Sequence, residues 1–368
     1  VCEKRTNLNA QEIGDDRQRA AQWQRFDRNP VWDEDELLAM VKAGVERLTA
    51  MQCSDGGWGW FSGWGEYSYP HTTAVVVHGL QVASENGVAL VPGTLERGVA
   101  WLKNYQAGQV TEIKNGMKKD PKPNPWKPYA DHLDAMVYEV LSVAGEENKE
   151  MHDFLYRDRV HLSLYSLSLF ALALDRQKHG EECGEVRRNL EQYLVENKEN
   201  QTAWLNLGNE GWWWCWYGSE IETLASYLKL LARVDPKGKV APQLVKYLLN
   251  NRKHATYWNS TRDTSLCVEA FSDYLKASGE DKPDLTVEVL VDGKKQKEVR
   301  ITPETLFTFD NKFLLWGDAV ETGKHTVELR KTGTAPLYLN AYLSYFTLED
   351  YITKAGLEIK VERTCFLL

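Results

Sequence analysis

Residues 51–61 read Met-Gln-Cys-Ser-Asp-Gly-Gly-Trp-Gly-Trp-Phe, and this stretch decides the fold. Its glycines permit sharp backbone turns, and its aromatic rings supply apolar surface for burial. Before it, apolar residues recur at three- and four-residue steps over 37–51, behind an acidic turn at 33–36. A second segment of the same kind runs from about residue 72 to 86. The sequence therefore predicts two helices joined by an aromatic loop.

The same unit, helix then aromatic loop then helix, is predicted twice more along the chain. The second copy closes a helix at 190–195 and carries Trp204 and residues 212–217 in its loop, before a helix from Ser219. Further helices, including the third copy, are expected at 93–105, 129–143, 161–177, 185–196, 244–249 and 262–274. Hairpins that cannot bury both faces alone must stack on one another. The pattern predicts a helical solenoid or a closed ring of hairpins.

The last quarter of the chain has a different composition. Thirteen of the 14 tryptophans precede residue 259, and a charged linker at 280–283 separates the helical part from a β-rich part. The dipeptide Asp292-Gly293 is a hairpin signal. Strands are expected at 286–291, 299–301, 306–309, 313–316, 325–329, 337–346 and 357–366. The predicted organisation is a helical domain at 1–280, a small antiparallel β-sandwich at 284–347, and a linker and strand of a truncated following domain at 348–368.

Composition excludes two classes of partner. Lysine and arginine total 44 against 53 aspartates and glutamates, and the net charge of -9 is the wrong sign for binding phosphates, so no nucleic acid is expected. No stretch is apolar for 18 residues, so no spanning helix is expected.

The chain begins at Val1 without a signal segment, which suggests a piece of a longer or processed protein. Its six cysteines are scattered and are interpreted as buried free thiols.

The tryptophans of the aromatic loops are the candidate interaction residues. They could line a pocket for an apolar or cationic ligand, or they could plug the ends of stacked hairpins, which is the preferred interpretation. The candidates are Trp58, Trp60, Trp64, Trp212, Trp213, Trp214, Trp216 and Trp258.

Catalytic and metal-binding motifs are weak in this sequence. The acidic turn at 33–36 resembles an Asp-x-Asp-Asp proton donor only in composition, and Asp15-Asp16 lacks the third acid of a magnesium-diphosphate site. The pairs His71 with His78 and Asp263 with Cys267 show no further ligands nearby in sequence. There is no Gly-x-Ser-x-Gly elbow and no glycine-rich phosphate loop. We therefore expect no catalytic residue, no cofactor and no metal.

Four landmarks resemble bacterial alpha-2-macroglobulin-like proteins. They are residues 51–61 followed by 72–74, residues 212–214 with 219–223, residues 258–264, and residues 306–311. The resemblance implies an α/α-toroid of the thioester-domain type, similar also to terpenoid cyclases and prenyltransferase β-subunits, followed by a CUB-like β-domain. Members of this family are large secreted or periplasmic proteins, sometimes lipid-anchored, that trap proteases after a bait region is cut.

The sequence departs from the family at the thioester, which requires Cys-x-Glu-Gln because the glutamine side chain acylates the thiol. The residues three positions after the six cysteines are Arg5, Gly56, Val186, Gly218, Ala270 and Leu368, so this motif is absent from the chain.

The resemblance predicts a C-terminal fragment that forms a structural or interaction part of a protease trap, an endopeptidase inhibitor rather than an enzyme. Its expected partners are proteases, through the full-length protein, and other domains of the parent chain. Membrane contact is expected only through a lipid anchor outside this sequence. Two alternatives remain at this point: an isoprenoid-cyclase-like toroid enzyme, and a tryptophan-lined carbohydrate- or peptide-binding module.

Overall fold

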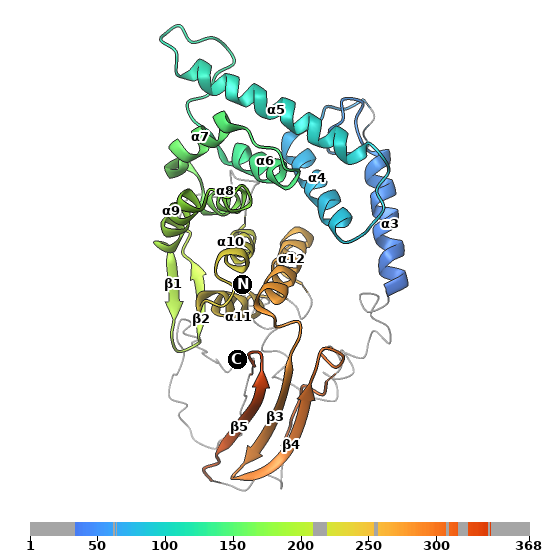
Figure 1. The fold of residues 1–368 in the computed structure, drawn as a ribbon, viewed down its shortest axis with the longest axis vertical. Helices are drawn as coiled ribbons and strands as arrows, with labels where there is room; N and C mark the ends of the chain where they lie inside the picture. Colours follow the sequence, from blue (N-terminus) through green and yellow to red (C-terminus); the bar gives the residue numbers. More distant parts are fainter. Residues whose placement is uncertain are drawn as a thin grey trace, which may run out of the picture. The chain divides into compact units, whose positions relative to one another are not determined.

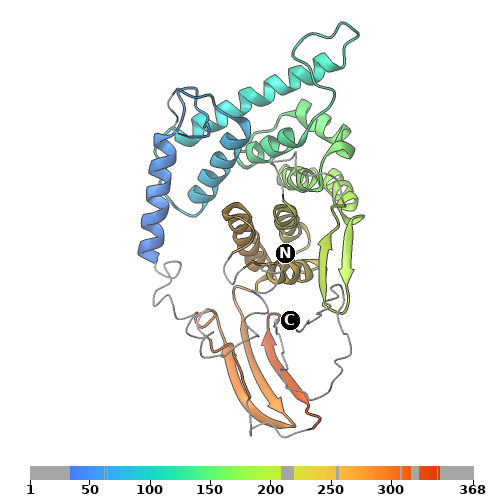
Figure 2. The same ribbon diagram turned by 180° about the vertical axis from the view of Figure 1, so that it is seen from behind.

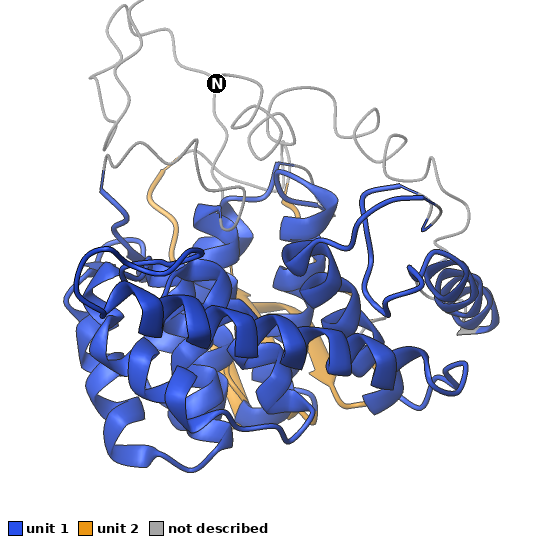
Figure 3. Cartoon of the chain, turned by 90° about the horizontal axis from the view of Figure 1, so that it is seen from above, with its two compact units in different colours: residues 1–281 blue, residues 282–368 orange. Residues whose placement is uncertain are grey.

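The computed structural model describes residues 34–337 and 339, except 62, 64, 209–218, 254–256, 307, 308 and 316–322. The chain divides into two compact units, residues 1–281 and 282–368, which Figure 3 shows in separate colours. The division falls within the charged segment 280–283.

The described part of the first unit contains ten α-helices, arranged as five consecutive hairpins (Figure 1). The first members of the hairpins are α3 (Glu34–Ala50), α5 (Thr94–Gly116), α7 (Lys149–Arg157), α9 (Gly180–Glu191) and α11 (Val240–Asn250). The second members are α4 (Pro70–Glu85), α6 (His132–Val143), α8 (Leu164–Arg176), α10 (Glu220–Val234) and α12 (Thr261–Ser278).

The second members form an inner row. Helix α4 packs against α6, α6 against α8, α8 against α10, and α10 against α12, while each first member packs on the inner row from outside. Figures 1 and 2 show this succession from opposite sides. Helix α8 is buried on every side along 164–174, as expected for the most apolar run of the sequence. The main core therefore lies between the two rows of helices.

The inner helices run in the same direction. At their N-terminal ends, the Ser163 N–H donates to His132 Nδ1 over 3.2 Å, which links α8 to α6, and the Ser219 hydroxyl donates to Asp263 Oδ1 over 2.6 Å, which links α10 to α12. At the opposite end, Arg176 of α8 donates to the last turn of α6.

Side chains cap the inner helices at the shared end. The side chains of Asp131, Ser163, Ser219 and Ser260 accept hydrogen bonds from backbone N–H groups of the first turns of α6, α8, α10 and α12. Helix α4 begins instead with Pro70, whose missing N–H costs nothing at that position.

Two helices of the first unit differ from what the sequence predicts. Helix α5 continues to Gly116 rather than stopping near residue 105, because the polar stretch 106–116 keeps Val110 and Ile113 on the buried face. Helix α7 was not predicted, since nine residues give too short a run to show a period clearly.

The segment 190–195, predicted to close a helix, instead leads into a strand. Strands β1 (Leu194–Asn197) and β2 (Thr202–Leu205) form an antiparallel hairpin that places Trp204 opposite Val195. Trp204 was expected in a loop; in the structure its ring stacks on Tyr247 of α11 with centroids 5.2 Å apart. This packing across the hairpin overrides the local helical pattern.

The second unit contains an antiparallel sheet in its described residues. Its order is β4 (Lys294–Ile301), β3 (Asp284–Val291), β5 (Val327–Thr334). The predicted turn joins β3 and β4, with φ of 50° at Asp292 and 77° at Gly293, as a tight hairpin of this hand requires. Leu285, Val287 and Ile301 form its small core.

One predicted strand of the second unit is not found, and others lie wholly or partly outside the described residues. Residues 313–315 have no regular structure, although a strand was predicted at 313–316. The predicted strand at 357–366, nearly all of that at 337–346 and part of that at 306–309 lie outside the described residues.

Candidate interaction surface

The structure describes three of the eight candidate tryptophans. Trp58 and Trp258 are buried, with 2% and 4% of their surfaces exposed, whereas Trp60 is 54% exposed. Neither buried indole offers surface to a partner. The remaining candidates lie outside the described residues: Trp64, Trp212, Trp213, Trp214 and Trp216.

Trp58 closes the end of the hairpin α3–α4. Its indole Nε1 donates to the Leu48 carbonyl over 2.7 Å, and its backbone N–H donates to Thr73 Oγ1 over 2.9 Å. The ring also packs closely on α5, because a β-carbon added to Gly98 would lie 2.7 Å from the nearest ring atom. Trp58 therefore joins the end of α3 through its side chain and the start of α4 through its backbone.

Trp258 repeats this arrangement in the hairpin α11–α12. Its Nε1 donates to the Leu248 carbonyl over 2.8 Å, and its backbone N–H donates to Thr264 Oγ1 over 3.1 Å. In both hairpins the acceptor carbonyl lies ten residues before the tryptophan. The predicted repeat of helix, aromatic loop and helix is confirmed for these two copies, and the preferred interpretation of the rings as plugs holds for both.

The polar residues of the opening stretch hold its loop in shape. Gln52 Nε2 donates to the Thr94 carbonyl over 2.9 Å and to a carbonyl within the loop over 2.8 Å. Asp55 accepts from Ser68 Oγ over 2.6 Å and from Trp101 Nε1 over 2.9 Å. Burial opposes ionisation of Asp55, but these hydrogen bonds hold its pKa below the usual range.

The outer face of the same loop carries exposed aromatic side chains. We call Trp60, Phe61, Tyr67 and Tyr69 the aromatic loop patch; Phe61 and Tyr67 are 80% and 87% exposed. Trp60 and Tyr69 meet edge to face, with centroids 6.0 Å apart. The Glu66 carboxylate accepts from the backbone N–H groups of Trp60 over 2.9 Å and Phe61 over 3.1 Å. A charged acceptor thus fixes the backbone that presents the patch.

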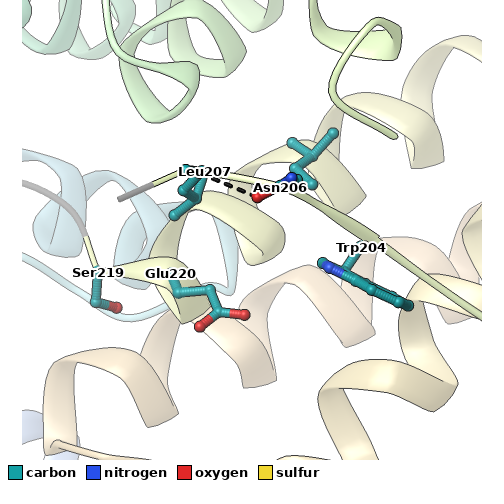
Figure 4. Close-up of a pocket in the computed structure, with 7 residues that line it drawn as sticks. Trp204, Asn206, Leu207, Ser219 and Glu220 are labelled. Atoms are coloured by element: carbon teal, nitrogen blue, oxygen red, sulfur yellow. Dashed lines mark hydrogen bonds between the residues drawn. The ribbon is translucent and has the colours of Figure 1, made fainter. Parts of the chain in front are cut away.

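A pocket of about 360 Å³ lies beside the start of α10 (Figure 4). Trp204, Asn206 and Leu207 line one side, and Ser219 and Glu220 line the other. Glu220 is the one carboxylate among the described lining residues, and its Oε1 accepts from a tyrosine hydroxyl over 2.8 Å. An acid and base pair would need a second titratable group. The described lining therefore offers shape, apolar surface and one carboxylate.

A largely buried ionic cluster joins three inner helices. Glu269 of α12 lies 3.0 Å from His78 Nε2 of α4 and also pairs with Lys229 Nζ of α10. Burial would raise the pKa of Glu269, but the bond and charge of His78 and the charge of Lys229 lower it to about 2. Burial would lower the pKa of His78, but Glu269 raises it above its usual value. The cluster connects the first and last inner helices that the structure describes.

The pairs dismissed as metal ligands have other environments. Burial, with the charge of Arg262, lowers the pKa of His71 to about 4, so this imidazole stays neutral at pH 7. Asp263 accepts from the Ser219 hydroxyl and lies in the first turn of α12, which Ser260 caps. Burial, with the charge of Asp263, raises the pKa of Cys267 to about 12, so its thiol stays protonated.

The described cysteines Cys53, Cys183 and Cys267 are free and buried, as the sequence predicts. In the acidic turn at 33–36, Asp35 lies in the first turn of α3 and is exposed rather than inside a cavity. None of the described helices is long and apolar enough to cross a membrane.

These features define a class of protein that is built from stacked α/α hairpins and a separate antiparallel β unit. Bacterial alpha-2-macroglobulins are among the known proteins to which the chain is similar. The alpha-2-macroglobulin of Thermotoga maritima is 25% identical over 244 residues, which are 65% of this chain and 12% of that protein. The Salmonella alpha-2-macroglobulin reacted with methylamine matches 75% of this chain and 17% of its own, with a TM-score of 0.51 and 18% identity.

The native Escherichia coli alpha-2-macroglobulin, from its domain MG7 to the C-terminus, matches 83% of this chain and 44% of its own at 20% identity and a TM-score of 0.47. No protein-family model matches the chain. The chain spans about an eighth of the curated relative it matches. The resemblance predicted from the sequence motifs is confirmed: the chain is similar to bacterial alpha-2-macroglobulins over most of its length.

Proposed function

We propose that this chain is the helical-hairpin and β-domain part of an alpha-2-macroglobulin-like protease trap, and that it contributes structure and contact surface rather than catalysis. The observation that carries the proposal is the shared fold with the Salmonella protein over 75% of the chain, together with the sequence relation to the Thermotoga protein. The parent protein is then an endopeptidase inhibitor of the secreted or periplasmic space.

The helical domain, 1–280, is proposed to be a closed α/α-toroid. Five inner helices follow one another and share a direction, and the ion pair between His78 and Glu269 supports contact between the first and last of them. The β unit, 284–347, is proposed to be CUB-like, and residues 348–368 to lead into a following domain.

The trap is proposed to act without a thioester from this chain. Capture through a thioester needs a thiol acylated by a glutamine three residues on, and none of the six cysteines has one. The Salmonella relative is described as reacted with methylamine, and Escherichia coli relatives as activated by trypsin or by porcine elastase. For this chain we expect its mass to be unchanged after methylamine treatment, because no acyl group is available for the amine to attack.

The alternative functions have less support. A cyclase needs a proton-donating acid inside an apolar cavity, and Asp35 is exposed instead. The aromatic loop patch favours contact with another protein surface, since four exposed rings on one loop are typical of interfaces. Within the proposed trap, the partner of this patch is another domain of the parent chain.

Protease protection tests the proposal. The natural full-length protein that carries this chain is mixed with trypsin or elastase and then separated by size. We expect the protease to move into a large complex that still cleaves a small peptide amide but no longer cleaves a large protein substrate. A protease that elutes alone and keeps full activity on large substrates overturns the proposal.

A further inference from the structure

Two imidazoles and a carboxylate converge where helix α7 meets the start of α9. His152 lies on α7, His179 immediately precedes α9, and Glu182 lies in its first turn. Glu182 Oε2 lies 2.8 Å from His152 Nε2 and 3.6 Å from His179 Nδ1. One ligand atom from each of the three residues can be chosen so that all lie within 4.8 Å of one another.

These spacings suit a tetrahedral metal ion. Ligand atoms about 2.0 Å from zinc at tetrahedral angles are about 3.3 Å apart, and the two printed separations lie on either side of this value. A small rotation of the side chains of His179 and Glu182, both partly exposed, would complete the geometry.

Further carboxylates hold the outer nitrogens of both imidazoles. His152 Nδ1 lies 3.3 Å from Asp153 Oδ1, and His179 Nε2 lies 3.2 Å from Glu147 Oε1. Each ring therefore turns one nitrogen toward Glu182 and the other toward a second acid. Histidines that ligate metals are commonly oriented in this way, because the outer carboxylate fixes the tautomer and makes the inner nitrogen more basic.

The charge of the cluster favours a cation. The three carboxylates, Glu147, Asp153 and Glu182, have the two imidazoles as their ion-pair partners among the described residues. With neutral rings the cluster carries three negative charges. His152 is buried, with 6% of its surface exposed, so solvent screens its part of the cluster weakly.

We propose that His152, His179 and Glu182 form a zinc site that joins the outer helices α7 and α9. Two imidazole nitrogens favour Zn²⁺ over Ca²⁺ or Mg²⁺, which prefer oxygen ligands. The three side chains leave one position for water, and the partial exposure of His179 and Glu182 gives the ion access.

The site has a structural consequence for two neighbouring hairpins. Helix α7 begins the third described hairpin and α9 begins the fourth. The ion would cross-link these outer helices through side chains and so oppose their separation, as other structural metals do when they bind the folded state.

Titration of the purified chain with ZnCl₂, after removal of metals with a chelator, tests the proposal. Calorimetry should show one zinc ion per chain and a higher melting temperature, whereas CaCl₂ and MgCl₂ should give neither. The variants His179→Ala and Glu182→Gln should each weaken zinc binding at least about tenfold. Both change partly exposed side chains, so their folded state is checked by circular dichroism before titration.

The control variant is His325→Ala, because His325 also pairs with a carboxylate, Asp292, over 2.7 Å in the second unit. It should bind zinc as the unaltered chain does. The outer-carboxylate variant Glu147→Gln should weaken binding about 10- to 100-fold without touching a ligand. Absence of zinc binding in the unaltered chain, or binding by His179→Ala and Glu182→Gln that is as tight as in the unaltered chain, overturns the proposal and leaves the cluster as ion pairs alone.

Discussion

Replacement of Glu269 by glutamine should destabilise the helical unit more than any exposed charge change. Glutamine keeps the size of the side chain and removes its charge. Its partners, His78 and Lys229, then remain largely buried without the carboxylate that contacts them both. Since Glu269 lies on α12 and His78 on α4, the substitution weakens the contact between the first and last described inner helices.

The expected cost follows from the pKa of Glu269. Its fall from 4.5 to about 2 corresponds to about 3 kcal/mol of unfolding free energy, at about 1.4 kcal/mol per pKa unit. Removal of one partner from a buried ionic pair costs about 3–5 kcal/mol in other proteins. A loss of about 3 kcal/mol is therefore expected for Glu269→Gln at pH 6.

The pH dependence has a definite sign. The folded-state pKa of Glu269 is lowered, so its contribution is complete above pH 4.5 and is lost as the pH falls from 4.5 toward 2. The pKa of His78 is raised, so its contribution is complete below pH 6.5 and is lost as the pH rises through the raised value. The unaltered chain should therefore exceed Glu269→Gln in stability most clearly between pH 4.5 and 6.5.

Urea unfolding followed by far-ultraviolet circular dichroism measures this difference, because all described α-helices lie in the first unit. The matched control is Glu146→Gln, since Glu146 pairs with Lys103 over 2.8 Å with both side chains well exposed. The control should cost less than about 1 kcal/mol. Equal costs for the two variants, or a difference between Glu269→Gln and the unaltered chain that persists at pH 2, would refute the reasoning.

Further predictions concern the aromatic loops and their neighbours. Gly98→Ala should cost about 1–3 kcal/mol because its β-carbon would stand 2.7 Å from the Trp58 ring. Gly108→Ala, in the same helix with no atom within 4 Å, should instead stabilise by about 0.5–1 kcal/mol, and thermal unfolding would separate the two. Trp58→Phe and Trp258→Phe should each cost about 1–3 kcal/mol in urea unfolding, because each removes the donor to a helix-end carbonyl; a loss in only one would contradict the repeat. Glu66→Gln should speed chymotrypsin cleavage in the aromatic loop patch while the melting temperature of the unit stays nearly constant, and unchanged cleavage would show that its carboxylate does not order the loop.

The sequence predicted the hairpins where apolar period and loop composition agreed. The helices around the opening stretch and those following Ser219 and Ser260 begin close to the expected residues, because capping side chains and apolar spacing are local signals. The strand β1 was missed because it forms only by pairing with β2, and the stacking of Trp204 of β2 on Tyr247 involves a residue distant in sequence.

The charged clusters were also beyond prediction from the sequence. His78 was recognised as a helical histidine, but its partner Glu269 lies 191 residues further along the chain. His152 and Glu182 lie 30 residues apart on a short helix and a helix start, and this spacing matches no metal motif. Only the packing of α7 beside α9 brings them together. Pairings of this kind depend on the tertiary fold, whereas caps and turns do not.

The tryptophan plug makes the packing of the two helices independent of the length of the loop that joins them. In the two described copies the backbone N–H of the tryptophan donates to a threonine hydroxyl, which lies 15 residues further along the chain in one hairpin and 6 residues further in the other. The anchoring bonds are nevertheless the same. Insertions between these two anchors can therefore lengthen or reshape the exposed loop while the helices keep their positions. Such a hairpin can change its outer surface during evolution with little cost to its core.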